Sequence, residues 1–184
     1  MSGVVTNNRI VNNLMGVVNW CYSPCSQVET ITNNLIAHNL NSGVIINEGQ
    51  AQLISNTVVY NQANGLDIQG QGSGGTIAYN VLSNNGTAVS ATSATILQDN
   101  LLWQNSANYA SGTLLGPSDL VTDPLFINPA ANDYHVEAVS PANGLGAGAS
   151  LFAPTGAAPA TVAASTSSQS CLLYTSDAAD DLTR

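Results

Sequence analysis

The stretches TNNLIAHN (32–39), SNTVVYNQ (55–62) and AYNVLSNN (78–85) repeat one pattern: an asparagine, one residue, an aliphatic residue, two residues and a second asparagine. Two more copies lie at 8–13 and 100–105, and the first asparagines are spaced by 26, 22, 24 and 20 residues. Periods of this length are typical of solenoids, in which each repeat forms one coil. The repeated asparagines are Asn8, Asn34, Asn56, Asn80 and Asn100, each followed five residues later by Asn13, Asn39, Asn61, Asn85 and Asn105.

Two aliphatic columns accompany the asparagines. Three residues before each first asparagine stand Val5, Ile31, Leu53, Ile77 and Leu97, and two residues after it stand Ile10, Ile36, Val58, Leu82 and Leu102. The return segments NLNSGVIINEGQAQ (39–52) and QANGLDIQGQGSGG (62–75) favour another short strand between turns, not the helix of many leucine-rich repeats. A left-handed β-helix would show a six-residue repeat, which is absent. The pattern therefore predicts an all-β, right-handed parallel β-helix of about five to six coils.

This fold gives the asparagines a structural role. Successive coils pair as parallel strands about 4.8 Å apart, so equivalent residues stack along the axis. A buried amide without a partner costs about 1–3 kcal/mol, and stacked asparagines supply partners for one another. Asparagine also tolerates the left-handed backbone conformation that tight turns need, so we expect it there. We expect two asparagine ladders and not a ligand site.

At this point the chain resembles the right-handed parallel β-helix repeat proteins of the pectate-lyase-like superfamily. The stretch DPLFINPAANDYHVEAVSPANG (123–144) is similar to the closing segment of secreted bacterial members. Members include pectate lyases, polygalacturonases, alginate epimerases, adhesins and phage tailspikes. The resemblance implies an extracellular or cell-surface location and a polysaccharide as partner, but no particular activity.

The chain divides into four stretches by composition. Residues 1–115 form the coils, 116–150 form the closing segment, and 151–170 are an Ala/Ser/Thr/Pro-rich flexible linker. Residues 171–184 resemble translated sequencing-adapter sequence, so we expect a non-native tail. No secretory signal precedes the first repeat, and we expect a fragment whose native N-terminus is missing.

The charge balance excludes some partners. The formal net charge is −9, and the only basic residues besides histidine are Arg9 and Arg184. Nucleic-acid binding needs phosphate neutralisation by such residues and is not expected. No apolar run reaches the roughly 18 residues of a membrane span. No cofactor is expected.

Few residues are candidates for a site. Cys21 and Cys25 fit either a small loop disulfide or two free thiols, and too few ligands accompany them for a metal. His38 and Tyr60 share an outward polar column: Asn12, His38, Tyr60, Asn84 and Gln104. Trp103 ends the neighbouring column, which contains Val11, Ala37, Val59 and Ser83, and we expect its ring to be exposed. These aromatic residues beside amides fit carbohydrate contact, although ordinary surface side chains fit as well.

The acids give no sign of catalysis. Glu48, Asp67 and Asp99 fall in different columns, so no carboxylate pair stacks on adjacent coils. We therefore expect an extracellular module with a structural or carbohydrate-contacting role, non-catalytic in this fragment. The alternative is a portion of a polysaccharide lyase, epimerase or glycoside hydrolase whose active site lies in missing upstream coils. The first coil is expected to be an open edge that favours self-association.

Overall fold

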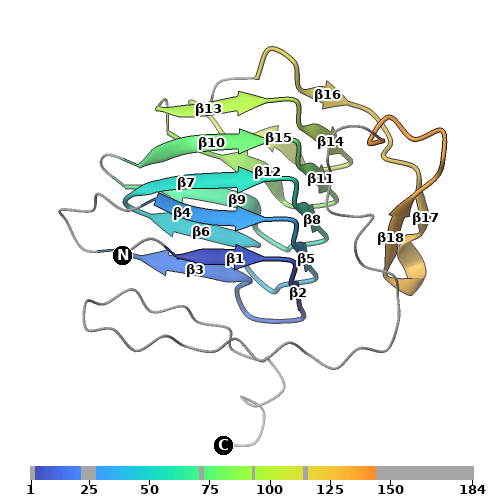
Figure 1. The fold of residues 1–184 in the computed structure, drawn as a ribbon, viewed down its shortest axis with the longest axis horizontal. Coiled ribbons are helices and arrows are strands. Elements are labelled where there is room, and N and C mark those ends of the chain that lie inside the picture. Colours follow the sequence, from blue (N-terminus) through green and yellow to red (C-terminus); the bar gives the residue numbers. More distant parts are fainter. Residues whose placement is uncertain (1–2, 22–27, 71–72, 93, 114–115, 144–184) are drawn as a thin grey trace, which may run out of the picture.

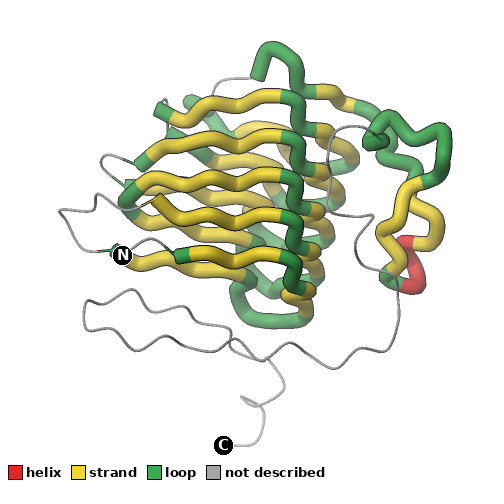
Figure 2. Tube along the Cα trace, in the orientation of Figure 1, coloured by secondary structure: helices red, strands yellow, loops and turns green. Residues whose placement is uncertain are grey.

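The chain folds as an all-β parallel β-helix of about five turns, which confirms the predicted fold class. The computed structural model describes residues 3–21, 28–70, 73–92, 94–113 and 116–143. In Figure 1 the chain rises coil by coil, and each coil contributes one short strand to each of three parallel sheets. Figure 2 shows the coils as stacked layers with sharp turns at one edge.

Three sheets run along the coil axis. The first sheet is five-stranded and contains β1 (Val4–Thr6), β4 (Val28–Thr32), β7 (Gln50–Ile54), β10 (Gly74–Ala78) and β13 (Thr95–Gln98). The second sheet is six-stranded and contains β2 (Arg9–Val11), β5 (Leu35–Ala37), β8 (Thr57–Val59), β11 (Val81–Ser83), β14 (Leu101–Trp103) and β16 (Leu120–Val121). The third sheet is five-stranded and contains β3 (Val17–Trp20), β6 (Val44–Asn47), β9 (Asn64–Gln69), β12 (Thr87–Ser90) and β15 (Ala107–Tyr109).

An antiparallel hairpin follows the last coil. It consists of β17 (Phe126–Asn128), the 3₁₀ turn η1 (Pro129–Ala131) and β18 (Asp133–Val136). Figure 1 shows it beside the second sheet, running back along the outside of the coils. Within the predicted closing segment 116–150, β16 still pairs with the coil strand β14, so below we use the name closing segment for residues 123–143 alone.

The core consists of the aliphatic columns read from the sequence. Ile31 pairs in register with Val5 and Leu53, and Ile77 pairs with Leu53 and Leu97. In the second sheet the middle residue of each three-residue strand forms the other column, from Ile10 to Leu102. Both columns belong to one buried cluster, because stacked coils place equivalent residues on top of one another.

The two asparagine ladders are confirmed, and each rung makes several hydrogen bonds. Asn80 Oδ1 accepts the backbone N–H of Asn56 at 2.8 Å and its side-chain Nδ2 at 3.1 Å. Asn56 Nδ2 also donates to the Ile31 carbonyl at 2.8 Å. The second ladder repeats the arrangement, with Asn85 Oδ1 accepting from both nitrogens of Asn61 at 3.0 and 2.9 Å. The inner rungs are therefore buried without loss of hydrogen bonding.

The turn conformation differs from the expectation in one respect. The left-handed residue is not the ladder asparagine but the residue before it, with φ between 50° and 61°. In the first turn these residues are Asn7, Asn33, Ser55, Tyr79 and Asp99, and in the second they are Asn12, His38, Tyr60, Asn84 and Gln104. At this residue the chain turns from one sheet to the next, so the asparagine that follows points inward and bonds along the axis. Left-handed backbone disfavours bulky side chains, so His38 and the two tyrosines are strained.

The last rung of the first ladder is an aspartate, which the repeated asparagine pattern did not predict. Asp119 Oδ1 accepts the backbone N–H of Asn100 at 2.8 Å and its Nδ2 at 3.0 Å. Asp119 Oδ2 accepts the Tyr109 hydroxyl at 2.6 Å, and burial together with this carboxylate raises the pKa of Tyr109. The backbone N–H of Asp119 bonds to the Gly116 carbonyl. Both carboxylate oxygens and the backbone N–H of Asp119 therefore have partners, and the ladder ends at this residue.

A carboxyl group lies inside the second coil, on β4, against the first coil. Glu29 shares its register position with Ala51 of the core and is only 8% exposed. Its Oε2 accepts the Gly3 N–H at 2.7 Å, and its Oε1 has no hydrogen-bond partner among the described residues. Burial raises the pKa of Glu29, and the hydrogen bonds from Gly3 and Asn19 offset this only in part.

We expect Asn56→Leu and Asn80→Leu each to lower the free energy of unfolding by about 2–4 kcal/mol, because neighbouring rungs lose buried partners worth about 1–3 kcal/mol each. The matched control is Asn8→Leu, since Asn8 is half-buried in the first coil and should be affected less. Urea denaturation measures all three. Equal stability of the wild type and both inner variants would contradict the structural ladder.

We expect Glu29→Gln to stabilise the protein at pH 7, with the gain shrinking on acidification. Since the folded-state pKa is raised above the ordinary value of 4.5, protonation of Glu29 favours the fold. This contribution is fully present below about 4.5 and is lost as the pH rises through the raised value. Melting temperatures of both proteins between pH 4 and 8 test it. A difference that does not vary with pH would show that Glu29 is not desolvated.

Candidate functional site

The outer face of the second sheet is covered by the closing segment. Its outward residues Leu35, Ala37 and Val59 are buried together with Tyr134 of β18, and Val81 and Leu101 are buried with Ala142. Phe126 of β17 packs against both groups and meets the Tyr134 ring edge-on. The closing segment therefore covers the column that Trp103 ends, so Ala37, Val59 and Ser83 are buried, and Trp103 itself is only partly exposed.

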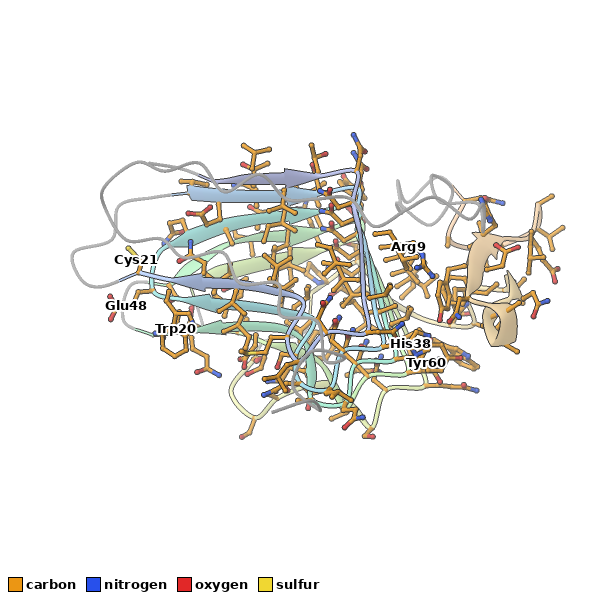
Figure 3. All side chains as sticks on the ribbon, turned by 90° about the horizontal axis from the view of Figure 1, so that it is seen from below. Arg9, Trp20, Cys21, His38, Glu48 and Tyr60 are labelled. Atoms are coloured by element: carbon orange, nitrogen blue, oxygen red, sulfur yellow. The ribbon has the colours of Figure 1, made fainter. Side chains whose placement is uncertain are left out.

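His38 and Tyr60 lie together, as equivalent residues of adjacent coils should. Their rings stack with centroids 5.1 Å apart and planes 8° from parallel. His38 Nε2 lies 2.6 Å from the hydroxyl oxygen of Tyr134, which ties the closing segment to the second coil. Figure 3 shows Arg9, His38 and Tyr60 at the side of the coils that faces this segment.

Tyr134 is the buried polar group of this cluster. Its side chain is 1% exposed, and its hydroxyl also lies 3.3 Å from Asn132 Oδ1. Burial raises the pKa of Tyr134, as does nearby Tyr60, while the positive charge of Arg9 opposes the shift. The phenol therefore stays protonated at neutral pH and acts as a neutral hydrogen-bonding group. The contact between His38 and Tyr134 holds two segments together and presents no charged nucleophile or base.

An open cleft continues the same turn column toward the C-terminal coils. A hollow of about 320 Å³ lies between the turns and the closing segment, with Tyr60, Asn84, Trp103 and Gln104 on the coil side. A second hollow of about 360 Å³ shares Tyr60, Asn84 and Gln104 and extends over the ladder toward the third sheet. We call the first hollow, between turns and closing segment, the turn cleft. Amides, a phenol and an indole thus line one groove parallel to the coil axis.

The closing segment adds two carboxylates to the turn cleft. Asp123 and Glu137 both line it and are both exposed. Asp123 Oδ1 accepts the Leu125 N–H at 2.8 Å, and the Leu125 carbonyl accepts the Glu137 N–H at 2.9 Å. Leu125 therefore places the two acids on the same cleft. The repeat pattern did not predict these two acids, because they lie in the closing segment and outside the coil columns.

The predicted site residues thus have different positions. His38 and Tyr60 are in contact, and Trp103 lines the turn cleft with Tyr60 while also packing against the Val81 and Leu101 cluster. Cys21 is disulfide-bonded, and its expected partner Cys25 lies outside the described residues. Trp20, Cys21 and Glu48 lie at the opposite side of the coils (Figure 3). Asp67 pairs with Ile45, so the register confirms that it stacks on no acid of that coil.

Comparison of the chain with protein-family models, curated proteins and solved structures finds no match. Among the described residues, three or more His, Cys, Asp or Glu side chains nowhere gather as metal ligands would. In the same part of the chain, no helix has the length and apolar character needed to cross a membrane. The turn cleft is therefore the candidate site on geometry alone.

We expect Tyr134→Phe to reduce the free energy of unfolding by about 1 kcal/mol, because the hydroxyl contacts with His38 and Asn132 are lost while the buried ring remains. Tyr134→Ala should cost about 3 kcal/mol or more, since the buried ring is removed. A double-mutant cycle with His38→Phe, measured by urea denaturation, isolates the pair. If His38→Phe costs as much in the Tyr134→Phe background as in the wild type, the contact does not couple the segments.

Proposed function

We propose that this chain is an extracellular β-helix module that binds a carbohydrate chain in the turn cleft and is non-catalytic in this fragment. The observation that carries the proposal is the lining of the cleft: Asn84 and Gln104 on its coil side, with Tyr60 and Trp103 beside them. Primary amides donate and accept at once, which suits sugar hydroxyls. Aromatic rings supply flat apolar surface with little rotamer freedom to lose.

The fold supports this role by holding the cleft residues rigidly. Tyr60 and Asn84 each precede a ladder asparagine whose backbone N–H is bound by the next rung, and Gln104 precedes Asn105, whose Oδ1 accepts the Asn85 N–H. Coil spacing of about 4.8 Å then presents side chains at regular intervals along the axis. Since little ordering is needed on binding, a modest contact area suffices for measurable affinity.

Other features support the extracellular location. A disulfide at Cys21 is favoured by an oxidising compartment. The closing stretch 123–144 resembles that of secreted β-helix proteins, and the charge-poor composition suits a surface of neutral polar side chains.

A structural role through self-association remains a prediction. Strands β1, β2 and β3 each stand at the end of their sheet, with one described neighbour. Unpaired parallel edges favour association with another strand.

We expect Tyr60→Ala and Trp103→Ala each to weaken binding of a neutral oligosaccharide at least about tenfold, which corresponds to 1.4 kcal/mol. Isothermal titration against a panel of neutral oligosaccharides measures this. The matched control is Tyr79→Ala, because Tyr79 is 36% exposed and has the same left-handed conformation but lies at the first turn. Absence of binding across the panel would refute the carbohydrate role, and release of new reducing ends would refute the non-catalytic part.

A further inference from the structure

The turn cleft carries negative charge with no compensating cation in its lining. Asp123 and Glu137 enter it from the closing segment, and its other lining residues are neutral. In the described chain the only lysine or arginine is Arg9, which lies near Tyr134 at the first coils. Of the two histidines, His38 contacts Tyr134 and His135 contacts Asp133, so neither lies in this lining.

The two carboxylates remain available to a ligand. Among the described residues the one ion pair joins His135 to Asp133, not to either cleft acid. Asp123 accepts the Leu125 N–H with Oδ1, so Oδ2 is not used in this hydrogen bond. Both side chains are exposed, so a bound group reaches them without burying an unpaired charge.

The effect of these charges on a ligand is large enough to decide between sugars. Even in a water-like dielectric, two unit charges about 4 Å apart attract or repel strongly enough to change an affinity roughly fivefold. A uronate carboxylate is repelled by each acid, whereas an ammonium is attracted by each. The sign is the same for both acids, so their effects add.

We infer that the turn cleft selects amine-bearing glycans over uronates, an inference that rests on the proposed carbohydrate role. A sugar ammonium donates to Asp123 or Glu137, as three N–H donors match carboxylate acceptors. The ring then faces Tyr60 or Trp103, and the same cation is attracted by the aromatic face. Asn84 and Gln104 bond the remaining hydroxyls and do not discriminate by charge.

The test uses three oligosaccharides of equal length: glucosamine oligomers, N-acetylglucosamine oligomers and oligogalacturonate. We expect affinity for the full chain, measured by isothermal titration at low salt, to fall in that order, with at least about a tenfold gap between the first and the last. The gap should narrow as ionic strength rises, because screening weakens exposed charges. In the variant Asp123→Asn with Glu137→Gln the difference in affinity between glucosamine oligomers and oligogalacturonate should disappear.

The matched control removes two charges elsewhere, in Asp99→Asn with Glu48→Gln. Like the cleft variant, it makes the net charge less negative by two, but it leaves the cleft intact. The difference in affinity between glucosamine oligomers and oligogalacturonate should therefore persist. Uronate binding as tight as amine binding would overturn the inference, and so would a gap that closes in the control but not in the cleft variant. Binding of the N-acetylated sugar in either case would leave the carbohydrate role standing. If none of the three sugars binds, both the role and the selectivity are wrong.

Discussion

Every coil of this protein depends on one hydrogen-bonding arrangement, in which a side-chain amide oxygen accepts two N–H groups from the preceding coil. Asn80 Oδ1 receives both nitrogens of Asn56, and Asn85 Oδ1 receives both nitrogens of Asn61. Because the acceptor lies at a fixed place in the next coil, the arrangement sets the register between coils. Register in turn decides that aliphatic residues meet aliphatic residues inside, where their burial stabilises the fold.

The same arrangement shapes the candidate site. A ladder asparagine points inward only if the chain turns just before it. The residue at that turn has a left-handed backbone, and its side chain projects outward. Tyr60, Asn84 and Gln104 occupy this position and line the turn cleft. The strain of placing a tyrosine there is balanced by the hydrogen bonds on either side and by ring stacking with His38. The asparagine ladders therefore both stabilise the coils and place the side chains that line the turn cleft.

The sequence was sufficient for the features that repeat. Ladders, aliphatic columns and fold class follow from spacing, since a period determines which residues stack. Contacts that do not repeat from coil to coil were not predictable. His38 contacts Tyr134, which is 96 residues away in the sequence. Nothing in the coil repeats indicates that the closing segment covers the second sheet. Asp119 was missed because a carboxylate replaces the amide, although Leu120 and Val121 follow it as Leu101 and Leu102 follow Asn100. Asp123 and Glu137 of the turn cleft were not predictable either, because they come from the closing segment, which has no repeat.

Both ladders have a direction, and this governs how such a protein changes length during evolution. Between ladder partners, each inner asparagine donates to the side-chain oxygen of the next coil and accepts with its own side-chain oxygen from the asparagine of the previous coil. If a gene segment encoding one inner coil is duplicated or lost, the new neighbours still offer donor to acceptor. Ladder partners already tolerate separations of 26, 22, 24 and 20 residues, whereas the five-residue step between the two asparagines never varies. The ladders therefore accept the insertion or loss of whole coils, whereas a one-residue insertion within that step would shift one ladder against the other.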